Sequence, residues 1–183
     1  GIAYSWLLQL LRRPSSASVS YEELNELASS APLGSDGLRF LPFGNGAERL
    51  LNNQAPGASL VNADFNRHDL THVSRAVLEG VVMAIAHGNT VLDELAISPS
   101  VLRAGEAGLF KCELFSQLLS TALDCPIELR DSDPSQGAAT GALVSGGYAD
   151  SVEELIGSQS PKALIEPVEK EKGTGRKGDR RII

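Results

Sequence analysis

Apolar positions recur at two different spacings along this chain, and the alternation of the two spacings predicts the order of its structural elements. Apolar residues that recur every three or four positions predict helices, while short apolar runs bounded by glycine predict buried strands. The longest periodic segment contains Gly80 and Gly88, each of which weakens a helix by about 1 kcal/mol unless a neighbour packs closely there. The predicted helices cover residues 4–14, 20–30, 69–95, 109–124 and 136–148, and the predicted strands cover residues 38–43, 58–66, 100–105 and 125–130.

Local signals support this order of elements. In the segment "SYEELNELASS", Ser20 stands three residues before Glu23, which is the spacing of a helix capping box. Strands that alternate with helices predict an α/β fold. The segment from Pro167 onward contains charged residues and glycine without any periodicity. We therefore expect one domain over residues 1–166 and a mobile charged tail over residues 167–183.

Composition and charge exclude several classes of protein. The 183 residues carry a formal charge of −7 with a pI near 5.0, which argues against a nucleic-acid-binding protein with a basic face. No apolar run has the length of a membrane span, and the N-terminus lacks the pattern of a signal peptide. Cys112 and Cys125 do not have the CxxC spacing of a zinc or redox site. We expect a reduced, cytoplasmic protein. Because Gly1 leads directly into an apolar helix, we also expect the sequence to be a piece of a longer chain.

Several familiar site patterns are absent from the sequence. No GxxxxGK[ST] phosphate loop and no GxSxG nucleophile elbow occurs. His68 and His72 are four residues apart and could share a metal, but the HExxH pattern is lacking, which favours a capping or surface role. We assign no metal ligand.

The stretch "GLRFLPFGNGAERLL" places a charged pair behind a predicted buried strand. Glu48 and Arg49 follow a turn that contains two glycines. Open α/β sheets bind ligands at such strand ends. An ion pair that only braces a surface loop would give the same pattern.

Two glycine-rich segments are candidate ligand sites. "RAGEAGLF", residues 103–110, predicts a strand that runs into a glycine turn and then into a helix start, where backbone N–H groups suit an anion or a nucleotide. "GAATGA", residues 137–142, places Gly137 and Gly141 one turn apart on one helix face, with Ala138 and Ala142 beside them. Small residues there allow either a ligand or another backbone to approach closely, so tight helix–sheet packing is the alternative.

Together, five segments in this order resemble the C-terminal half of the FGGY carbohydrate kinases, most closely the xylulokinase-like branch. The resemblance covers residues 1–149. The segments are "SWLLQLL" with "YEELNELA", "GSDGLRFLPFGNGAER", "ADFNRHDLTHVSRAVLEGVVMAIAHGNTVLDEL", "LRAGEAGLFKCELFSQLLSTALDCPIEL" and "QGAATGALVSGGY".

The resemblance implies a partial ribonuclease-H-like lobe of the actin-like ATPase type, with a mixed sheet and packed helices. In these kinases two lobes close around ATP, Mg²⁺ and a sugar, and catalysis is mostly positioning and charge neutralisation. The C-terminal lobe supplies the adenine surface and much of the phosphate surface. The N-terminal lobe supplies most sugar contacts and the catalytic Asp. The implied reaction is phosphoryl transfer to a ketopentose such as D-xylulose.

The resemblance also implies site residues. Glu48 and Arg49 stand at the family's Gly-Glu-Arg turn near the interlobe cleft. Many members have three glycines and an alanine where this chain has residues 104–108, so Glu106 departs from the pattern, and we expect its carboxylate to point away from a nucleotide phosphate. The implied nucleotide-binding residues are Ala104, Gly105, Glu106, Gly108, Gly137 and Gly141.

The expected behaviour of the isolated chain follows from what this resemblance leaves outside it. The N-terminal lobe and its catalytic Asp are missing, so we assign no catalytic residue and expect weak nucleotide binding without turnover. Missing opening strands would expose a sheet edge and favour a homo-oligomer. The alternative function is a non-catalytic actin-like binding or assembly module.

Overall fold

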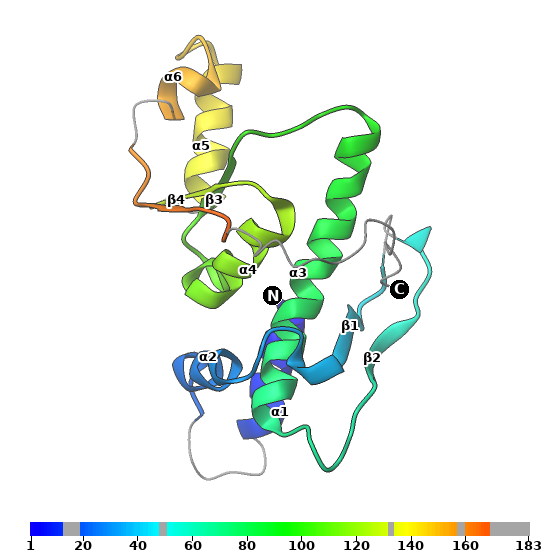
Figure 1. The fold of residues 1–183 in the computed structure, drawn as a ribbon. Helices are drawn as coiled ribbons and strands as arrows, with labels where there is room; N and C mark the ends of the chain where they lie inside the picture. The colour runs from blue at the N-terminus through cyan, green and yellow to red at the C-terminus, as the bar shows by residue number, and fades with distance from the viewer. Residues whose placement is uncertain (13–18, 48–50, 132–133, 157–159, 169–183) are drawn as a thin grey trace.

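The structure is a computed structural model that describes residues 1–12, 19–47, 51–131, 134–156 and 160–168. Helices and strands alternate along most of this length (Figure 1). The helices are α1 (Ile2–Arg12), α2 (Tyr21–Ser30), α3 (Leu70–Glu94), α4 (Glu113–Leu123), α5 (Pro134–Ser145) and α6 (Val152–Ile156), with short 3-10 helices η1 (Ser35–Gly37) and η3 (Gly108–Lys111). The strands are β1 (Arg39–Phe43), β2 (Gly57–Val61), β3 (Leu102–Gly105), β4 (Ile127–Arg130) and β5 (Ala163–Ile165).

The strands form two small sheets. β1 and β2 are an antiparallel pair, in which Arg39 lies opposite Val61 and Phe43 opposite Gly57. The second sheet has the order β3-β4-β5 and is mixed, because β4 is parallel to β3 and antiparallel to β5. The predicted α/β fold with a mixed sheet is confirmed.

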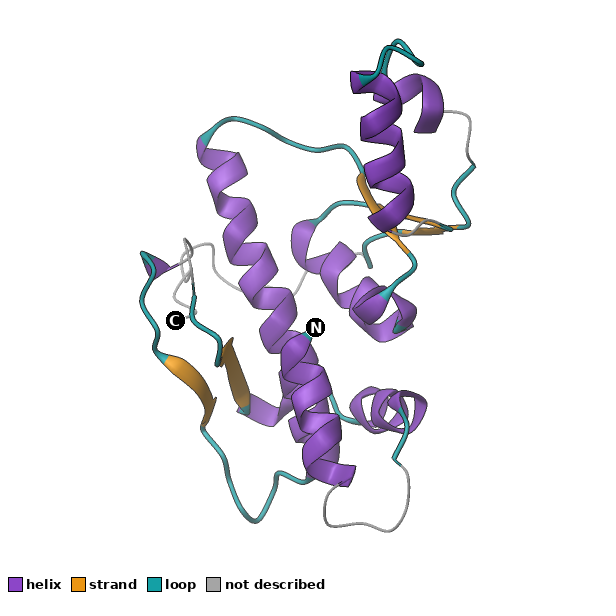
Figure 2. Cartoon of the chain, turned by 180° about the vertical axis from the view of Figure 1, so that it is seen from behind, coloured by secondary structure: helices purple, strands orange, loops and turns teal. Residues whose placement is uncertain are grey.

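The connection from β3 through α4 to β4 is a βαβ unit, the arrangement that parallel strands require. Helix α4 lies on one side of the sheet and α5 rises from the other side (Figures 1 and 2). Phe115 and Leu119 of α4 are buried, as are Ile127 and Leu129 of β4. These residues join the sheet to the apolar cluster that also contains buried side chains of α1, α2, α3 and β1.

Helix α2 begins with the capping box that the sequence predicts. The Ser20 hydroxyl accepts a hydrogen bond from the Glu23 amide at 3.2 Å, and a Glu23 carboxylate oxygen accepts one from the Ser20 amide at 2.8 Å. These bonds satisfy two donors that a helix start leaves unpaired. Leu24 and Ala28 then lie on the buried face, one turn apart.

Helix α3 passes through the centre of the structure (Figure 2). Five consecutive residues, Ser74, Arg75, Ala76, Val77 and Leu78, are buried, so this part of the helix is covered on every side. Gly80 follows on the face that meets β1. A Cβ atom on Gly80 would lie 2.2 Å from the Phe40 carbonyl oxygen, so helix and strand backbones touch directly. The sequence analysis expects a glycine inside a helix to be tolerated where a neighbour packs closely, and Phe40 is that neighbour at Gly80.

A left-handed turn precedes β1 and is held by α3. Gly34 and Gly37 have φ of +81° and +94°, and the two residues between them, Ser35 and Asp36, also have positive φ, of +48° and +49°. The Gly34 amide donates to a Glu79 carboxylate oxygen at 2.9 Å, and Arg75 Nε donates to the same oxygen at 2.8 Å. Non-glycine residues adopt this conformation only where their surroundings enforce it. The mostly buried Arg75–Glu79 pair supplies that enforcement.

Two predictions about the strands are wrong, and one strand was not predicted. The segment 38–43 was expected to lie inside a sheet, but in the described chain β1 pairs only with β2, and only Phe40 of its five residues is buried. The segment 58–66 gives the shorter β2, because the chain turns at Asn62, which has φ of +61°. The pattern did not predict β5 at all.

The cysteines and the possible membrane spans were also considered in the sequence analysis. Cys112 and Cys125 are free and buried, and burial raises the pKa of the Cys112 thiol. Among the described helices, none combines the length and the apolar character that a membrane crossing requires.

Replacing Gly80 with alanine tests the contact between α3 and β1. The new methyl group would overlap the Phe40 carbonyl, and we expect Gly80→Ala to lower the free energy of unfolding by about 2 kcal/mol or more. Urea denaturation of the purified chain measures this. Gly137→Ala is the matched control: a Cβ there has no neighbour within 4 Å, so the change should be neutral or stabilising by up to about 1 kcal/mol. Equal stability of the two variants would contradict the close approach.

Candidate nucleotide site at the carboxyl edge of the small sheet

The carboxyl ends of the parallel strands β3 and β4 meet at one edge of the second sheet. Gly105, the last residue of β3, lies in register with Arg130, the last residue of β4. The Glu106 amide then donates to the Arg130 carbonyl at 2.9 Å, which ties the following turn to β4. Open α/β sheets bind ligands at this edge. The turn therefore lies at the edge of the sheet where the sequence predicts a ligand site.

The turn itself spans residues 105–109. The Ala107 amide donates to the Gly105 carbonyl at 2.7 Å, and the Phe110 amide donates to the Ala107 carbonyl at 3.1 Å. Gly108 has φ of +57°, the left-handed region that glycine adopts readily. Within the described residues, the amides of Gly108 and Leu109 have no acceptor. These two N–H groups could bind an anionic oxygen above the turn.

One detail of the prediction is wrong. The long helix was expected to start at Leu109, directly after the turn, but η3 occupies Gly108–Lys111 and α4 begins only at Glu113. Cys112 is the N-cap residue of α4 and makes no side-chain capping bond. The amides available at the turn belong to η3 and not to the longer helix.

Charged side chains of β3, β4, the turn and the residue before β5 form one cluster of three residues and one ion pair. A Glu128 carboxylate oxygen accepts bonds from Arg103 Nε at 3.0 Å and from Arg130 Nη2 at 3.1 Å. The two guanidinium groups, Arg103 first, hold the pKa of the Glu128 carboxyl below its usual value. Glu106 forms an ion pair with Lys162, which lies just before β5. The Glu106 side chain is thus turned toward Lys162 just before β5, and its predicted orientation relative to a nucleotide phosphate stays a prediction.

Helix α5 carries the second predicted set of glycines. Gly137 and Gly141 have open space where a Cβ would stand, with no heavy atom within 4 Å. Ala138 and Ala142 are exposed as well. The alternative of tight helix–sheet packing therefore does not describe these two glycines in the described structure. Both predicted sets follow the carboxyl ends of neighbouring parallel strands, so they start from the same edge of the sheet.

Of the remaining predicted residues, the structure describes Ala104, and it adds Lys162. Ala104 lies in β3, in register with Leu129. Glu48 and Arg49 lie outside the described residues. Sequence reasoning missed Lys162, because no local pattern connects it to Glu106, which precedes it by 56 residues.

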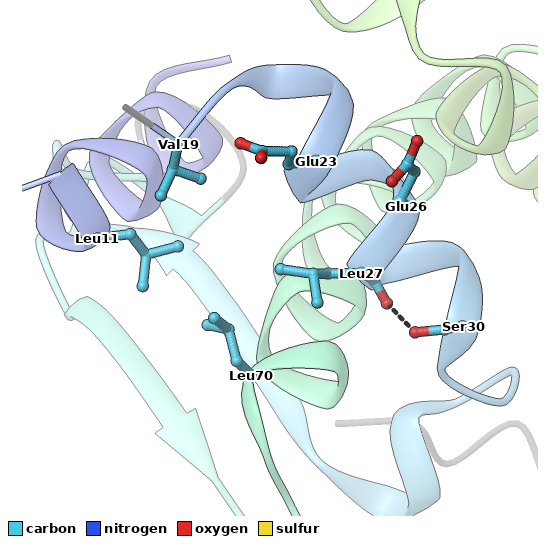
Figure 3. A pocket seen from close by; sticks show the side chains of 7 residues that line it. All are labelled: Leu11, Val19, Glu23, Glu26, Leu27, Ser30 and Leu70. Carbon is cyan, nitrogen blue, oxygen red and sulfur yellow. Dashed lines mark hydrogen bonds between the residues drawn. The ribbon is translucent and has the colours of Figure 1, made fainter. Parts of the chain in front are cut away.

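The cavity shown in Figure 3 lies away from this edge, where the end of α1, helix α2 and the start of α3 meet. Its volume is about 520 Å³. The cavity is lined by the carboxylates of Glu23 and Glu26 of α2 and by apolar side chains (Figure 3). The two carboxylates would repel a phosphate group. The lining residues are Leu11, Val19, Glu23, Glu26, Leu27, Ser30 and Leu70.

His68 and His72, the metal candidates of the sequence, take part in loop and helix-start contacts. His68 Nδ1 accepts a bond from the Asp64 amide at 3.0 Å, and His72 Nδ1 lies 2.8 Å from an Asp69 carboxylate oxygen. Among the described residues, no group of three or more His, Cys, Asp or Glu side chains could hold a metal ion. His68 thus braces the loop before α3, while His72 lies beside Asp69, whose carboxylate accepts bonds from the Thr71 and His72 amides at the helix start.

Comparisons with known proteins agree with this geometry. Residues 1–149 match the profile described as "FGGY family of carbohydrate kinases, C-terminal domain". The chain is 25% identical to a xylulose kinase of Haemophilus influenzae over 75% of its own length and 29% identical to a gluconokinase of Bacillus subtilis over 82%. It spans only 27% and 30% of those two proteins.

Solved structures show the same fold. The xylulose kinase of Rhodospirillum rubrum is 26% identical and superposes with a TM-score of 0.74 over 92% of this chain and 34% of its own. A glycerol kinase of Plasmodium falciparum, solved with ADP, shares the fold at 23% identity and a TM-score of 0.69, over 89% of this chain and 32% of its own. The described domain is therefore the mixed α/β lobe that these kinases share.

Asp69 gives a prediction about acid stability. At the start of α3, the Asp69 carboxylate accepts a hydrogen bond from the Thr71 hydroxyl and also interacts with His72. These contacts, the Thr71 bond most of all, lower the pKa of Asp69. A lowered pKa in the folded state stabilises the fold above the unfolded pKa of about 3.9, and this stabilisation is lost as pH falls below it. We expect the urea midpoint to fall less between pH 6 and pH 3 in Asp69→Asn than in the unmodified chain. Asp150→Asn, which changes an exposed carboxylate outside this cluster, should fall as the unmodified chain does, and identical slopes for all three would refute the assignment.

Proposed function

We propose that this chain, which belongs to the FGGY family of carbohydrate kinases through its C-terminal domain, provides the nucleotide-binding lobe of an ATP-dependent sugar kinase. The observation that carries the proposal is the glycine turn at the carboxyl edge of β3 and β4, with the amides of Gly108 and Leu109 available. Helix α5, which follows β4, presents its small residues to open space. Phosphoryl transfer needs such positioning surfaces more than it needs covalent chemistry.

Each part of the edge has a role in this proposal. The turn from Gly105 to Gly108 would hold the nucleotide through backbone groups, which accept close approach because two positions lack a side chain. Gly137 and Gly141 would let a flat or phosphorylated group lie against α5 without a clash. We expect Mg²⁺ to arrive bound to the phosphates of ATP, because Mg²⁺ at kinase sites is held by substrate phosphates and one or two carboxylates, and Glu106 is already paired with Lys162.

The sugar is assigned by weighing two groups of relatives. We propose D-xylulose, a ketopentose, because the order of segments resembles the xylulokinase-like branch and a xylulose kinase is 25% identical. D-gluconate is the second candidate, because a gluconokinase is 29% identical. The catalytic Asp would come from the lobe outside this chain, and Glu48 and Arg49 would shape the cleft between the lobes. The chain spans under a third of its curated relatives, so we expect it to be inactive alone.

An activity assay tests the reaction and the sugar together. ADP release would be followed with ATP, Mg²⁺ and either D-xylulose or D-gluconate, first with the full-length protein that carries this chain and then with the chain alone. We expect turnover near the typical ~10 s⁻¹ with D-xylulose for the full-length protein and none for the chain. Faster turnover with gluconate would reassign the sugar. Nucleotide binding without turnover on either sugar would favour the non-catalytic actin-like module.

A substitution on α5 tests the nucleotide surface. Gly141→Leu fills the open face of the helix, so we expect ATP affinity of the full-length protein to fall at least about tenfold, since a side chain there excludes the ligand. Stability should not fall, because no heavy atom lies within 4 Å of the new Cβ. Ser29→Leu, at an exposed position of α2, is the control and should leave ATP binding unchanged. Unchanged affinity in Gly141→Leu would remove α5 from the site.

A further inference from the structure

The ion pair between Lys162 and Glu106 crosses the end of β4. The Lys162 amide donates to the Leu129 carbonyl at 2.8 Å, while the Glu106 amide donates to the Arg130 carbonyl at 2.9 Å. Both residues are therefore fixed by backbone bonds to neighbouring positions of one strand. Their side chains then meet across it, which joins β5 to the glycine turn after β3.

The balance of charge at this edge depends on Lys162. Three cations and three carboxylates belong to it, namely Arg103, Arg130, Lys162, Glu106, Glu128 and Asp131. Arg103 and Arg130 both bind Glu128. Lys162 faces Glu106, and Asp131 lies close enough to add to its electrostatic environment. Removal of the Lys162 ammonium would leave the edge with a net charge of −1, next to the amides proposed to receive phosphate.

This pair is poorly explained as a contribution to stability. The Lys162 side chain is 56% exposed and the Glu106 side chain 33% exposed. Exposed ion pairs add little to folding because water screens them and ordering two side chains costs entropy. What connects this pair to the candidate site is its position, because Glu106 directly follows Gly105 in the turn after β3.

We propose that Lys162 is a positioning residue of the nucleotide site, which neutralises Glu106 and holds it against β5 so that the phosphates of a nucleotide can approach the Gly105–Gly108 turn. This inference rests on the proposed function, and it adds a residue outside the matched segment 1–149. A carboxylate without a partner would repel the phosphates, and a neutral side chain at position 106 would not need the lysine.

The test measures ATP affinity of the full-length protein with a fluorescent ATP analogue in the absence of sugar. We expect Lys162→Met to weaken binding roughly fivefold at low ionic strength, and the difference should shrink in high salt as screening increases. Lys162→Arg should bind as the unmodified protein does. Steady-state kinetics should show a raised KM for ATP with an unchanged KM for the sugar, which loss of folding alone would not produce.

The double variant separates action through Glu106 from direct binding of phosphate by Lys162. Glu106→Gln alone leaves these six positions with a net charge of +1 and should bind ATP more tightly than the unmodified protein. Glu106→Gln combined with Lys162→Met restores a net charge of zero and should bind ATP as the unmodified protein does. A double variant as weak as Lys162→Met would overturn the inference. Arg67→Met removes an exposed cation from the loop before α3, outside the proposed site, and should change affinity less than twofold.

Failure of the inference can be told apart from failure of the proposed function. If the unmodified protein binds ATP and Lys162→Met binds it equally well, with the fold intact by thermal melting, the inference is wrong and the proposed function stands. If the unmodified full-length protein binds no ATP, the proposed function is wrong and the inference falls with it.

Discussion

The direct contact between the backbones of α3 and β1 sets the geometry of the rest of the molecule. A glycine at position 80 lets the helix lie against the Phe40 carbonyl, where any side chain would meet it at 2.2 Å. With the helix this close, Ala76, Val77 and Leu78 become buried among α1, α2 and α4. Helix α4 then packs on α3 and carries the small sheet with it. Helix α3 therefore positions the candidate site indirectly, through α4.

The sequence predicts well those elements whose signal is local. The apolar period of α3 and the capping box of α2 depend on residues within a few positions of each other, and both appear in the structure as predicted. Strand β5 is different, because its three residues become a strand only by pairing with β4. The left-handed turn at Ser35 and Asp36 also escapes prediction, since it is held by Glu79 far along the chain.

The candidate site divides in the same way. The turn after β3 could be predicted because strand, glycines and the following helical segment are contiguous between residues 102 and 123. The partner of Glu106 could not be, because Lys162 reaches it only through the order β3-β4-β5. For α5, the sequence left open whether Gly137 and Gly141 serve packing or a ligand, and only the three-dimensional surroundings show that their face is open.

The distribution of burial separates stability from the proposed binding role. The buried side chains gather on α1, α2, α3, α4, β1 and β4, whereas the turn after β3, helix α5 and Lys162 are half-buried or exposed. A three-stranded sheet with one long exposed helix buries little apolar surface of its own, so its order depends on α4 and on what covers the exposed side. Under the proposed function this exposure would serve binding, because a second lobe would have to close onto the exposed edge around the nucleotide. Residues buried within this lobe could not reach a ligand held between two lobes.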